Sequence, residues 1–355
     1  MVKRRKTTQI RIGDVHIGSK FPISIQSMCN TKTIDVKNTI NQIIMLEKAG
    51  CNLIRLAIPD LESAQAIKKI KTAIHIPIIA DIHFDHKLAI AALRNGVDAI
   101  RINPGNIGSQ AKIKSLVEHL QERQIPIRIG VNSGSIPNHL LQKFGVSAQS
   151  IVESALEHIR ILEDLNYNQI KISVKASSVP LTIEAYKQLA KQTKYPFHIG
   201  ITESGTEFTG SIKSAIGIGT LLAQGIGDTL RVSLTSDPLQ EIKVGKTILQ
   251  ALELQKGLNI ISCPTCGRTN IPLISLANEV EKQLLPYQHL NITVAIMGCE
   301  VNGPGEAKEA DYGIAGGKNE GLLFKKGTII AKIPAEKLVE SLINQICNDI
   351  PIFMD

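Results

Sequence analysis

The feature that most constrains the fold of this chain is a repeated unit, in which a short apolar run precedes a stretch of helical periodicity. The apolar runs occupy residues 23–28, 52–57, 76–82, 99–103, 126–132, 169–175, 197–202 and 229–233. Helical spacing predicts helices at 35–50, 61–72, 86–95, 109–123, around 152–162, and at 181–193, 213–225 and 238–255. Eight such units over about 250 residues predict an α/β fold, a (β/α)8 TIM barrel in residues 1–256. A doubly wound sheet is the alternative, but no Gly-x-Gly-x-x-Gly motif opens a helix after the first run.

The composition fits such a barrel and narrows the class of partner. The chain has no Trp and 3% aromatic residues, so Ile, Leu, Val and Ala must fill the core, as in parallel sheets. Lys and Arg total 40 against 32 acidic residues, and this excess favours an anionic partner such as a phosphate ester. Few aromatic side chains are available for stacking on bases, so we expect no nucleic-acid partner.

Other features of the sequence predict a cytoplasmic protein. No apolar run reaches the roughly 20 residues that a membrane span needs, and the basic N-terminus lacks the apolar segment of a secretory signal. The chain has six cysteines, which we expect to be reduced thiols. We therefore expect no membrane association.

The pattern changes after residue 256, and residues 257–355 predict a small α/β domain. We expect strands at 260–262 and 292–297, a helix at 273–285, short strands within 312–332 and a last helix at 335–347. This domain holds the motif Cys263-Pro-Thr-Cys266 and then Cys299, which is followed by Gly-Pro-Gly-Glu306.

Three cysteines without a fourth at ligand-like spacing leave three interpretations open. One is a [4Fe-4S] cluster with a non-thiolate ligand, because soft thiolates suit such clusters. Another is a zinc ribbon, which expects a second Cys or His pair. The third is a redox dithiol, which expects the motif to open a helix in a thioredoxin-like context.

A set of cations lies where the barrel strands are expected to end, the end at which TIM barrels hold their chemistry. The set consists of Arg55, Arg101, Arg128, Lys171, Lys175 and Arg231. Strand alternation places Arg101 with Asn103, Arg128 with Asn132, and Arg231 with Ser233 on common faces. Because Arg and Lys match phosphate oxygens, these faces predict a site for a small diphosphate. Asp81 or Glu203 could neutralise some of the cations, and Glu203 is also a candidate general acid or base.

Together these residues resemble one known family, the 4-hydroxy-3-methylbut-2-enyl diphosphate synthases of the non-mevalonate isoprenoid pathway, in their compact bacterial form. The matching stretches are 26–28, 80–84, 101–108, 126–132, 173–177, 200–203, 213–217, 227–233, 263–266 and 301–306. Cys29 departs from the Thr expected there, and residues 205–210 depart from the usual small and basic residues.

The resemblance implies an oxidoreductase that opens a ring reductively. It converts 2-C-methyl-D-erythritol 2,4-cyclodiphosphate to (E)-4-hydroxy-3-methylbut-2-enyl diphosphate plus water, with two electrons from flavodoxin or ferredoxin through a [4Fe-4S] cluster. It also implies a homodimer in which one chain's cluster domain caps the other's barrel.

The resemblance also assigns residues. Cys263, Cys266, Cys299 and Glu306 match the cluster ligands. The substrate-binding positions are Arg55, Arg101, Asn103, Arg128, Asn132, Lys175, Arg231, Ser233 and, from the second domain, Asn302. Thr202 and Glu203 match residues near the reacting carbons. The rival interpretations are a pterin-type methyltransferase barrel, which gives the cysteines no role, and a zinc-binding nucleic-acid module.

Overall fold

The computed structural model of the chain describes residues 2–83, 85–102, 110–299 and 307–350. The chain divides into two compact units, Met1–Leu254 and Gln255–Asp355, each with its own core. Asn103, Asn302 and Glu306, which the sequence selects for the site, lie outside the described residues. In the described part of the chain, no helix is both long and apolar enough to cross a membrane.

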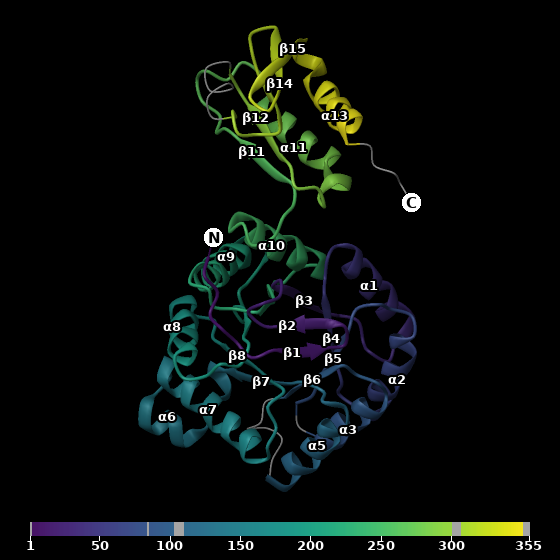
Figure 1. Cartoon of the computed structure of the whole chain (residues 1–355), viewed down its shortest axis with the longest axis vertical. Coiled ribbons are helices and arrows are strands. Elements are labelled where there is room, and N and C mark those ends of the chain that lie inside the picture. Colours follow the sequence, from purple (N-terminus) through teal and green to yellow (C-terminus); the bar gives the residue numbers. More distant parts are fainter. Residues whose placement is uncertain (1, 84, 103–109, 300–306, 351–355) are drawn as a thin grey trace. The chain divides into compact units, whose positions relative to one another are not determined.

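The first unit is the predicted (β/α)8 barrel (Figure 1). Its strands are β3 (Ser24–Met28), β4 (Leu53–Ala57), β5 (Ile78–Asp81), β6 (Ala99–Ile102), β7 (Ile127–Asn132), β8 (Ile170–Lys175), β9 (His198–Ile199) and β10 (Thr229–Leu230). They pair in parallel in the order β8-β7-β6-β5-β4-β3-β10-β9. A parallel bridge between Ile172 and Phe197 joins the two ends of this order and closes the barrel.

Helices follow the strands and surround them, as Figure 1 shows. They are α1 (Val36–Lys48), α2 (Leu61–Lys71), α3 (His86–Arg94), α5 (Gln110–Arg123), α6 (Asn138–Phe144), α7 (Ala148–Asp164), α8 (Val179–Ala190), α9 (Glu207–Ala223) and α10 (Pro238–Ala251). Several begin where a short polar side chain satisfies a free backbone N–H group, as Asp35 does for Asn38 and Asp60 for Ser63.

A hairpin that the sequence analysis missed precedes the barrel. Its strands β1 (Ile10–Ile12) and β2 (Val15–Ile17) are three residues each, too short to show a recognisable period. Ile10, Ile12 and Ile17 are buried together with Leu53, Ile79 and Ala99 from the first halves of three barrel strands. The hairpin therefore closes the amino-terminal end of the barrel, which leaves the carboxyl ends of the strands for the site.

The ends of two strands and the start of one helix near the site were also predicted wrongly. Strands β9 and β10 are two residues each, and α9 begins at Glu207, six residues before the predicted start. The glycines made this segment look like a loop, but Gly210 lies inside the helix for a packing reason. A Cβ atom there would lie 2.6 Å from Leu234, so the close approach of helix and loop requires glycine.

The second unit is a five-stranded sheet with helices, as the sequence predicts. Its strands, in sheet order, are β11 (Asn259–Ser262), β12 (Thr293–Met297), β13 (Tyr312–Ala315), β14 (Glu320–Lys325) and β15 (Thr328–Pro334). The first three are parallel and the last two pair antiparallel. Helices α11 (Leu273–Gln283) and α13 (Leu338–Asp349) contribute Val280 and Leu342 to a core that also includes Ile296.

Candidate active site

A cavity of about 270 Å³ lies at the carboxyl ends of the barrel strands. Its lining is almost entirely polar: Arg55, Asp81, His83, Arg101, Arg128, Gly130, Asn132, Ser173, Lys175, Thr202, Arg231 and Ser233. These residues come from strands β4 to β8 and from the segments that follow β5, β9 and β10. Figure 1 shows these strands side by side in the barrel. The cavity thus gathers cations that are far apart in the sequence.

Strand register explains why these side chains meet. Asp81 on β5 is directly opposite Arg101 on β6, and Arg101 is directly opposite Arg128 on β7. Farther along, Asn132 is opposite Lys175 on β8. Side chains that are directly opposite point to the same face of a sheet, which here is the interior of the barrel.

Asp81 neutralises two of the cations. Its carboxylate accepts a hydrogen bond from Arg101 Nη1 at 2.9 Å and lies 3.6 Å from Arg55 Nε. His83 Nε2 lies 3.6 Å from the same carboxylate and 3.2 Å from Arg101 Nη1. Burial acts to raise the pKa of Asp81, but Arg55, His83 and Arg101 outweigh it and hold that pKa below its ordinary value. Asp81 is therefore ionised at neutral pH.

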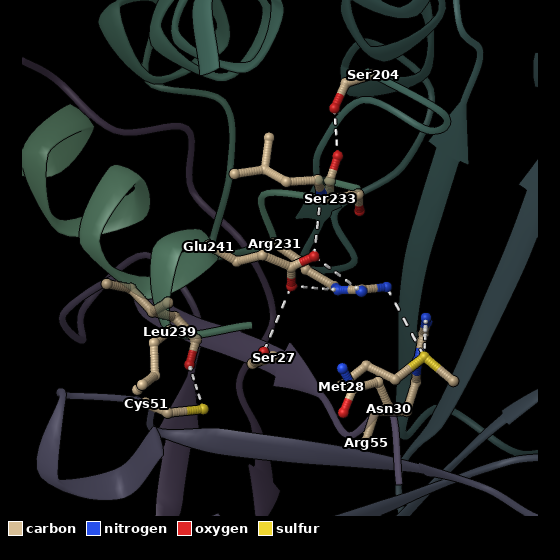
Figure 2. A network of polar contacts seen from close by, with 12 residues as sticks. Ser27, Met28, Asn30, Cys51, Arg55, Ser204, Arg231, Ser233, Leu239 and Glu241 are labelled. Carbon is tan, nitrogen blue, oxygen red and sulfur yellow. Dashed lines mark hydrogen bonds and ion pairs between the residues drawn. The ribbon is translucent and has the colours of Figure 1, made fainter. Parts of the chain in front are cut away.

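A second carboxylate, Glu241, neutralises Arg231, and the sequence analysis missed it. Glu241 lies in the first turn of α10 and accepts hydrogen bonds from Arg231 Nε and Nη2, both at 3.2 Å. It also accepts from the backbone N–H of Leu234 at 3.0 Å and from Ser27 Oγ at 3.4 Å (Figure 2). A charged residue within the apolar stripe of Ile242, Gly245 and Leu249 was the signal that could have revealed it.

The thioether of Met28 lies between Arg55, which pairs with Asp81, and Arg231, which pairs with Glu241 (Figure 2). Its Sδ atom accepts hydrogen bonds from Arg55 Nε at 3.2 Å and Nη2 at 2.9 Å, and lies 3.8 Å from Arg231 Nη1. An uncharged, polarisable group between two cations spaces them without cancelling their charge.

Arg128 and Lys175 differ from these arginines, because neither forms an ion pair with a carboxylate among the described residues. Both are buried, and Nε and Nη1 of Arg128 have no hydrogen-bond partner in the described part of the chain. Burial first, and then the neighbouring arginines, lower the pKa of each well below its ordinary value. Burying a cation without a counter-ion costs free energy, so this arrangement is expected at a site that binds an anion.

Glycines make room for the cations. A Cβ atom on Gly130 would lie 2.9 Å from Arg101 Nε. One on Gly200 would lie 2.7 Å from Lys175 Nζ and 2.4 Å from the carbonyl oxygen of Arg231. Gly130 is itself part of the cavity wall, and the absence of a side chain at Gly200 leaves room for Lys175.

The structure brings together most of the residues that the sequence selected. Arg55, Arg101, Arg128, Asn132, Lys175, Thr202, Arg231 and Ser233 all line the cavity. Lys171 was expected at the mouth, but it is buried and does not line the cavity, whereas Ser173 and Lys175 farther along the same strand do.

Glu203 is not among the lining residues. It is exposed and has a φ of 51° in the segment that follows β9. Of the two carboxylates that the sequence offered as counter-ions, Asp81 pairs with Arg55 and Arg101, whereas Arg231 pairs with Glu241 and not with Glu203. Positive φ at a non-glycine residue is uncommon and occurs often at functional sites.

Three cysteines of the second unit lie on neighbouring loops. Cys263 directly follows β11, and its sulfur accepts a hydrogen bond from the backbone N–H of Gly298 at 3.1 Å, next to Cys299. The loop that carries Cys266 returns to the same glycine, because Asn270 N donates to Gly298 O at 3.1 Å. Hydrogen bonds from Arg268 lower the pKa of Cys266, which favours its thiolate. No trio of His, Cys, Asp or Glu side chains within the described residues has the spacing of a metal site.

Both units of the chain match models of known protein domains. The family model described as the GcpE TIM-barrel domain matches residues 7–246, and the GcpE protein C-terminal domain matches residues 259–348. Curated relatives named 4-hydroxy-3-methylbut-2-en-1-yl diphosphate synthase (flavodoxin) are similar over nearly the whole chain. The protein from Ruminiclostridium cellulolyticum is 59% identical over 97% of this chain and 98% of its own length. The one from Geobacter sulfurreducens is 56% identical over 97% of this chain and 98% of its own length.

Solved structures resemble the barrel in fold alone. A type I 3-dehydroquinate dehydratase from Clostridium difficile gives a TM-score of 0.53 at 14% identity, over 69% of this chain and 98% of its own. A dihydropteroate synthase from Stenotrophomonas maltophilia gives a TM-score of 0.51 at 13% identity, over 70% of this chain and 98% of its own.

Proposed function

The chain belongs to the GcpE family, and we therefore propose that it is an oxidoreductase that converts 2-C-methyl-D-erythritol 2,4-cyclodiphosphate to (E)-4-hydroxy-3-methylbut-2-enyl diphosphate and water. This is a step of isoprenoid precursor synthesis by the non-mevalonate pathway. The names of its relatives include flavodoxin, so we propose reduced flavodoxin as the electron donor.

One observation carries the proposal, the pair of buried cations that lack a carboxylate. Arg128 and Lys175 line a small polar cavity and have no ion-pair partner among the described residues. A cyclic diphosphate carries two negative charges, and its opening at a carbon–oxygen bond creates a third on the freed phosphate oxygen. Groups of the cavity lining that donate hydrogen bonds or carry positive charge stabilise this developing charge as the ring opens.

Each lining residue then has a role in holding the substrate. Arg101 and Arg55 are oriented by Asp81, so their remaining N–H groups can donate to phosphate oxygens. Asn132 and Ser233 add neutral donors at the rim of the cavity. We propose Asn103 and Asn302 as further contacts, on the basis of their positions in the family's motifs.

We propose that Cys263, Cys266, Cys299 and Glu306 hold a [4Fe-4S] cluster. The donor set fits, because thiolates are the usual ligands and the N–H of Gly298 already points at the sulfur of Cys263. When bound, a cluster of this kind supplies single electrons and a Lewis-acidic iron. The cysteines contribute negative charge and anchoring, and the N–H of Gly298 tempers the charge on one sulfur.

Thr202 and Glu203 are the proposed catalytic residues. Thr202 lines the cavity, and Glu203 follows it in the left-handed backbone conformation. We propose that Glu203 donates the proton with which the hydroxyl group leaves as water. In the Glu203→Gln variant, turnover should fall by more than tenfold while substrate still binds; turnover within a few-fold of wild type would exclude this role.

We propose that two chains form a homodimer and share each active site. Mixing a chain that carries Arg128→Ala with one that carries Cys299→Ser tests this, because each lacks a different part of the site. Recovery of activity on mixing would support a shared site, and two inactive chains that stay inactive as a dimer would refute it.

We further propose that the protein works in the cytoplasm and binds no nucleic acid. The six cysteines form no disulfide, as expected in a reducing compartment. The cations converge inside a cavity, whereas a nucleic-acid phosphate backbone requires them along an exposed surface.

The pterin-type methyltransferase has no support beyond the barrel fold, and neither it nor a zinc-binding nucleic-acid module uses both the cavity and the cysteines.

The deciding experiment uses protein purified without oxygen. Incubation with the cyclodiphosphate and enzymatically reduced flavodoxin should give the linear diphosphate product, measured by chromatography, and iron analysis should give about four irons per chain. Stoichiometric zinc with salt-sensitive RNA binding and no turnover would refute the proposal.

A further inference from the structure

Lys171 is a buried lysine that the proposed reaction does not yet use. It lies on β8, is 2% exposed, and its Nζ atom has no hydrogen-bond partner among the described residues. It is directly opposite Arg128 on β7. Lys171 therefore belongs to the barrel interior and not to a surface ion pair.

Its position is one layer below the cavity. Ser173 and Lys175 follow on the same face of β8, and both line the cavity. Two residues of a strand span about 7 Å, so the amine lies within range of a charge bound above it. Register places Arg128, which lines the cavity, directly beside Lys171.

The groups around Lys171 are mainly positive. Arg128 lies on β7, Arg55 on β4, and His198 on β9 is close enough to be affected by it. The carboxylate that faces it, Asp228, already accepts a hydrogen bond from Arg4 at 2.9 Å. Burial first, and then Arg128, lower the pKa of Lys171 well below its ordinary value, against the opposing effect of Asp228.

We propose that Lys171 couples proton uptake to ligand binding: its amine is unprotonated in the free enzyme and takes up a proton when an anionic diphosphate occupies the cavity. The inference rests on the proposed function for the nature of the ligand. A dianion bound beside Arg128 offsets part of the surrounding positive charge, so the protonated form of the amine becomes more favourable. The site thereby gains one positive charge when it is needed, without the cost of burying it beforehand.

This coupling fixes the sign of a pH effect. Protonated Lys171 is favoured in the complex, so affinity is highest at low pH and falls as pH rises past the value at which the free enzyme loses this proton. Linkage of one proton limits the fall to tenfold per pH unit. Once pH exceeds the pKa of Lys171 in the complex, affinity no longer depends on this residue.

Calorimetric titration tests the proposal on the intact, oxidised holoenzyme without a reductant, so that the cyclodiphosphate binds but is not turned over. Each phosphorus of this cyclic ligand carries a single strongly acidic hydroxyl, so the ligand is a dianion at neutral pH and takes up no proton itself. Titrations in buffers of different ionisation enthalpy give the number of protons taken up. We expect uptake that approaches one proton from Lys171 within one interval of pH.

Three variants separate Lys171 from its neighbours. In Lys171→Met, this uptake should disappear and affinity at the low-pH end should fall about tenfold, while the free variant melts no lower than wild type because an unpaired buried amine is gone. Lys171→Gln serves the same purpose if methionine does not fold. In Lys175→Met, affinity should fall but the uptake due to Lys171 should persist.

The outcomes are distinct. If proton uptake is unchanged in Lys171→Met and Lys171→Gln, the inference is overturned and the proposed function is not. The same holds if wild type binds the cyclodiphosphate without taking up a proton. Wild type that does not bind the cyclodiphosphate at any pH overturns the proposed function and this inference with it.

Discussion

Glu241 holds Arg231 by two hydrogen bonds, to Nε and to Nη2, each 3.2 Å long. Both of its oxygens also accept a further hydrogen bond, from Leu234 N or from Ser27 Oγ. An amide in place of the carboxylate would turn one acceptor into a donor that faces donors. Arg231 owes its orientation at the cavity to this carboxylate.

Glu241→Gln should therefore raise the KM for the cyclodiphosphate about tenfold, as loss of one charge-assisted hydrogen bond implies, and change kcat by less than threefold. Steady-state kinetics with reduced flavodoxin checks this. Ser27→Ala is the matched control, because it removes a contact to the same carboxylate without touching Arg231, and it should leave KM unchanged. An equal rise in KM in both variants would indicate a general loss of packing.

Asp81→Asn should lower the stability of the free enzyme by about 3–5 kcal/mol, the usual cost of removing one partner from a buried ion pair. Asp81 is 4% exposed, and its removal leaves Arg55 and Arg101 without a counter-ion among the described residues. Denaturant unfolding measures the loss. Ligand should restore part of it, because the phosphates then supply the missing negative charge. A variant as stable as wild type would show that these arginines need no counter-ion.

The same substitution should change the response to acid. The pKa of Asp81 in the folded protein is below the roughly 3.9 of an unfolded chain. Its stabilising effect is therefore fully present above about pH 4 and is lost as pH falls toward the folded pKa. The free energy of unfolding should fall less steeply below about pH 4 in Asp81→Asn than in wild type.

The positions of the cavity residues were predictable from the sequence because strand periodicity is two and parallel strands end at one edge. Arg101, Arg128 and Lys175 follow directly from that rule. Glu241 was not predictable, since its contact with Arg231 depends on how α10 docks on the barrel. Lys171 was predicted at the mouth of the barrel, but it does not line the cavity. Strand alternation predicts the face on which a side chain lies, but not how deep in the barrel it lies.

Gly130→Ala should weaken binding of the cyclodiphosphate about tenfold. The added Cβ atom would lie 2.9 Å from Arg101 Nε, closer than real contacts allow, and Arg101 is held on its other side by Asp81. The guanidinium must therefore shift within the site. Gly134→Ala is the control, since nothing lies within 4 Å of a Cβ atom there. Calorimetric affinities that match for the two variants would contradict this role of Gly130.

Replacement of Cys263, Cys266 or Cys299 by Ser should lower the iron content from about four per chain to below one, because a hydroxyl is a poor substitute for a soft thiolate ligand. Diphosphate binding should remain within a few-fold of wild type, since the cavity residues belong to the first compact unit.

Cys347→Ser is the matched control in the second unit, where the sulfur lies 2.7 Å from Tyr287 Oη, and it should keep its iron. Iron analysis and calorimetry on the same anaerobic samples separate the two functions. Full iron content in Cys299→Ser, or loss of iron in Cys347→Ser to the same extent, would contradict the assigned ligands.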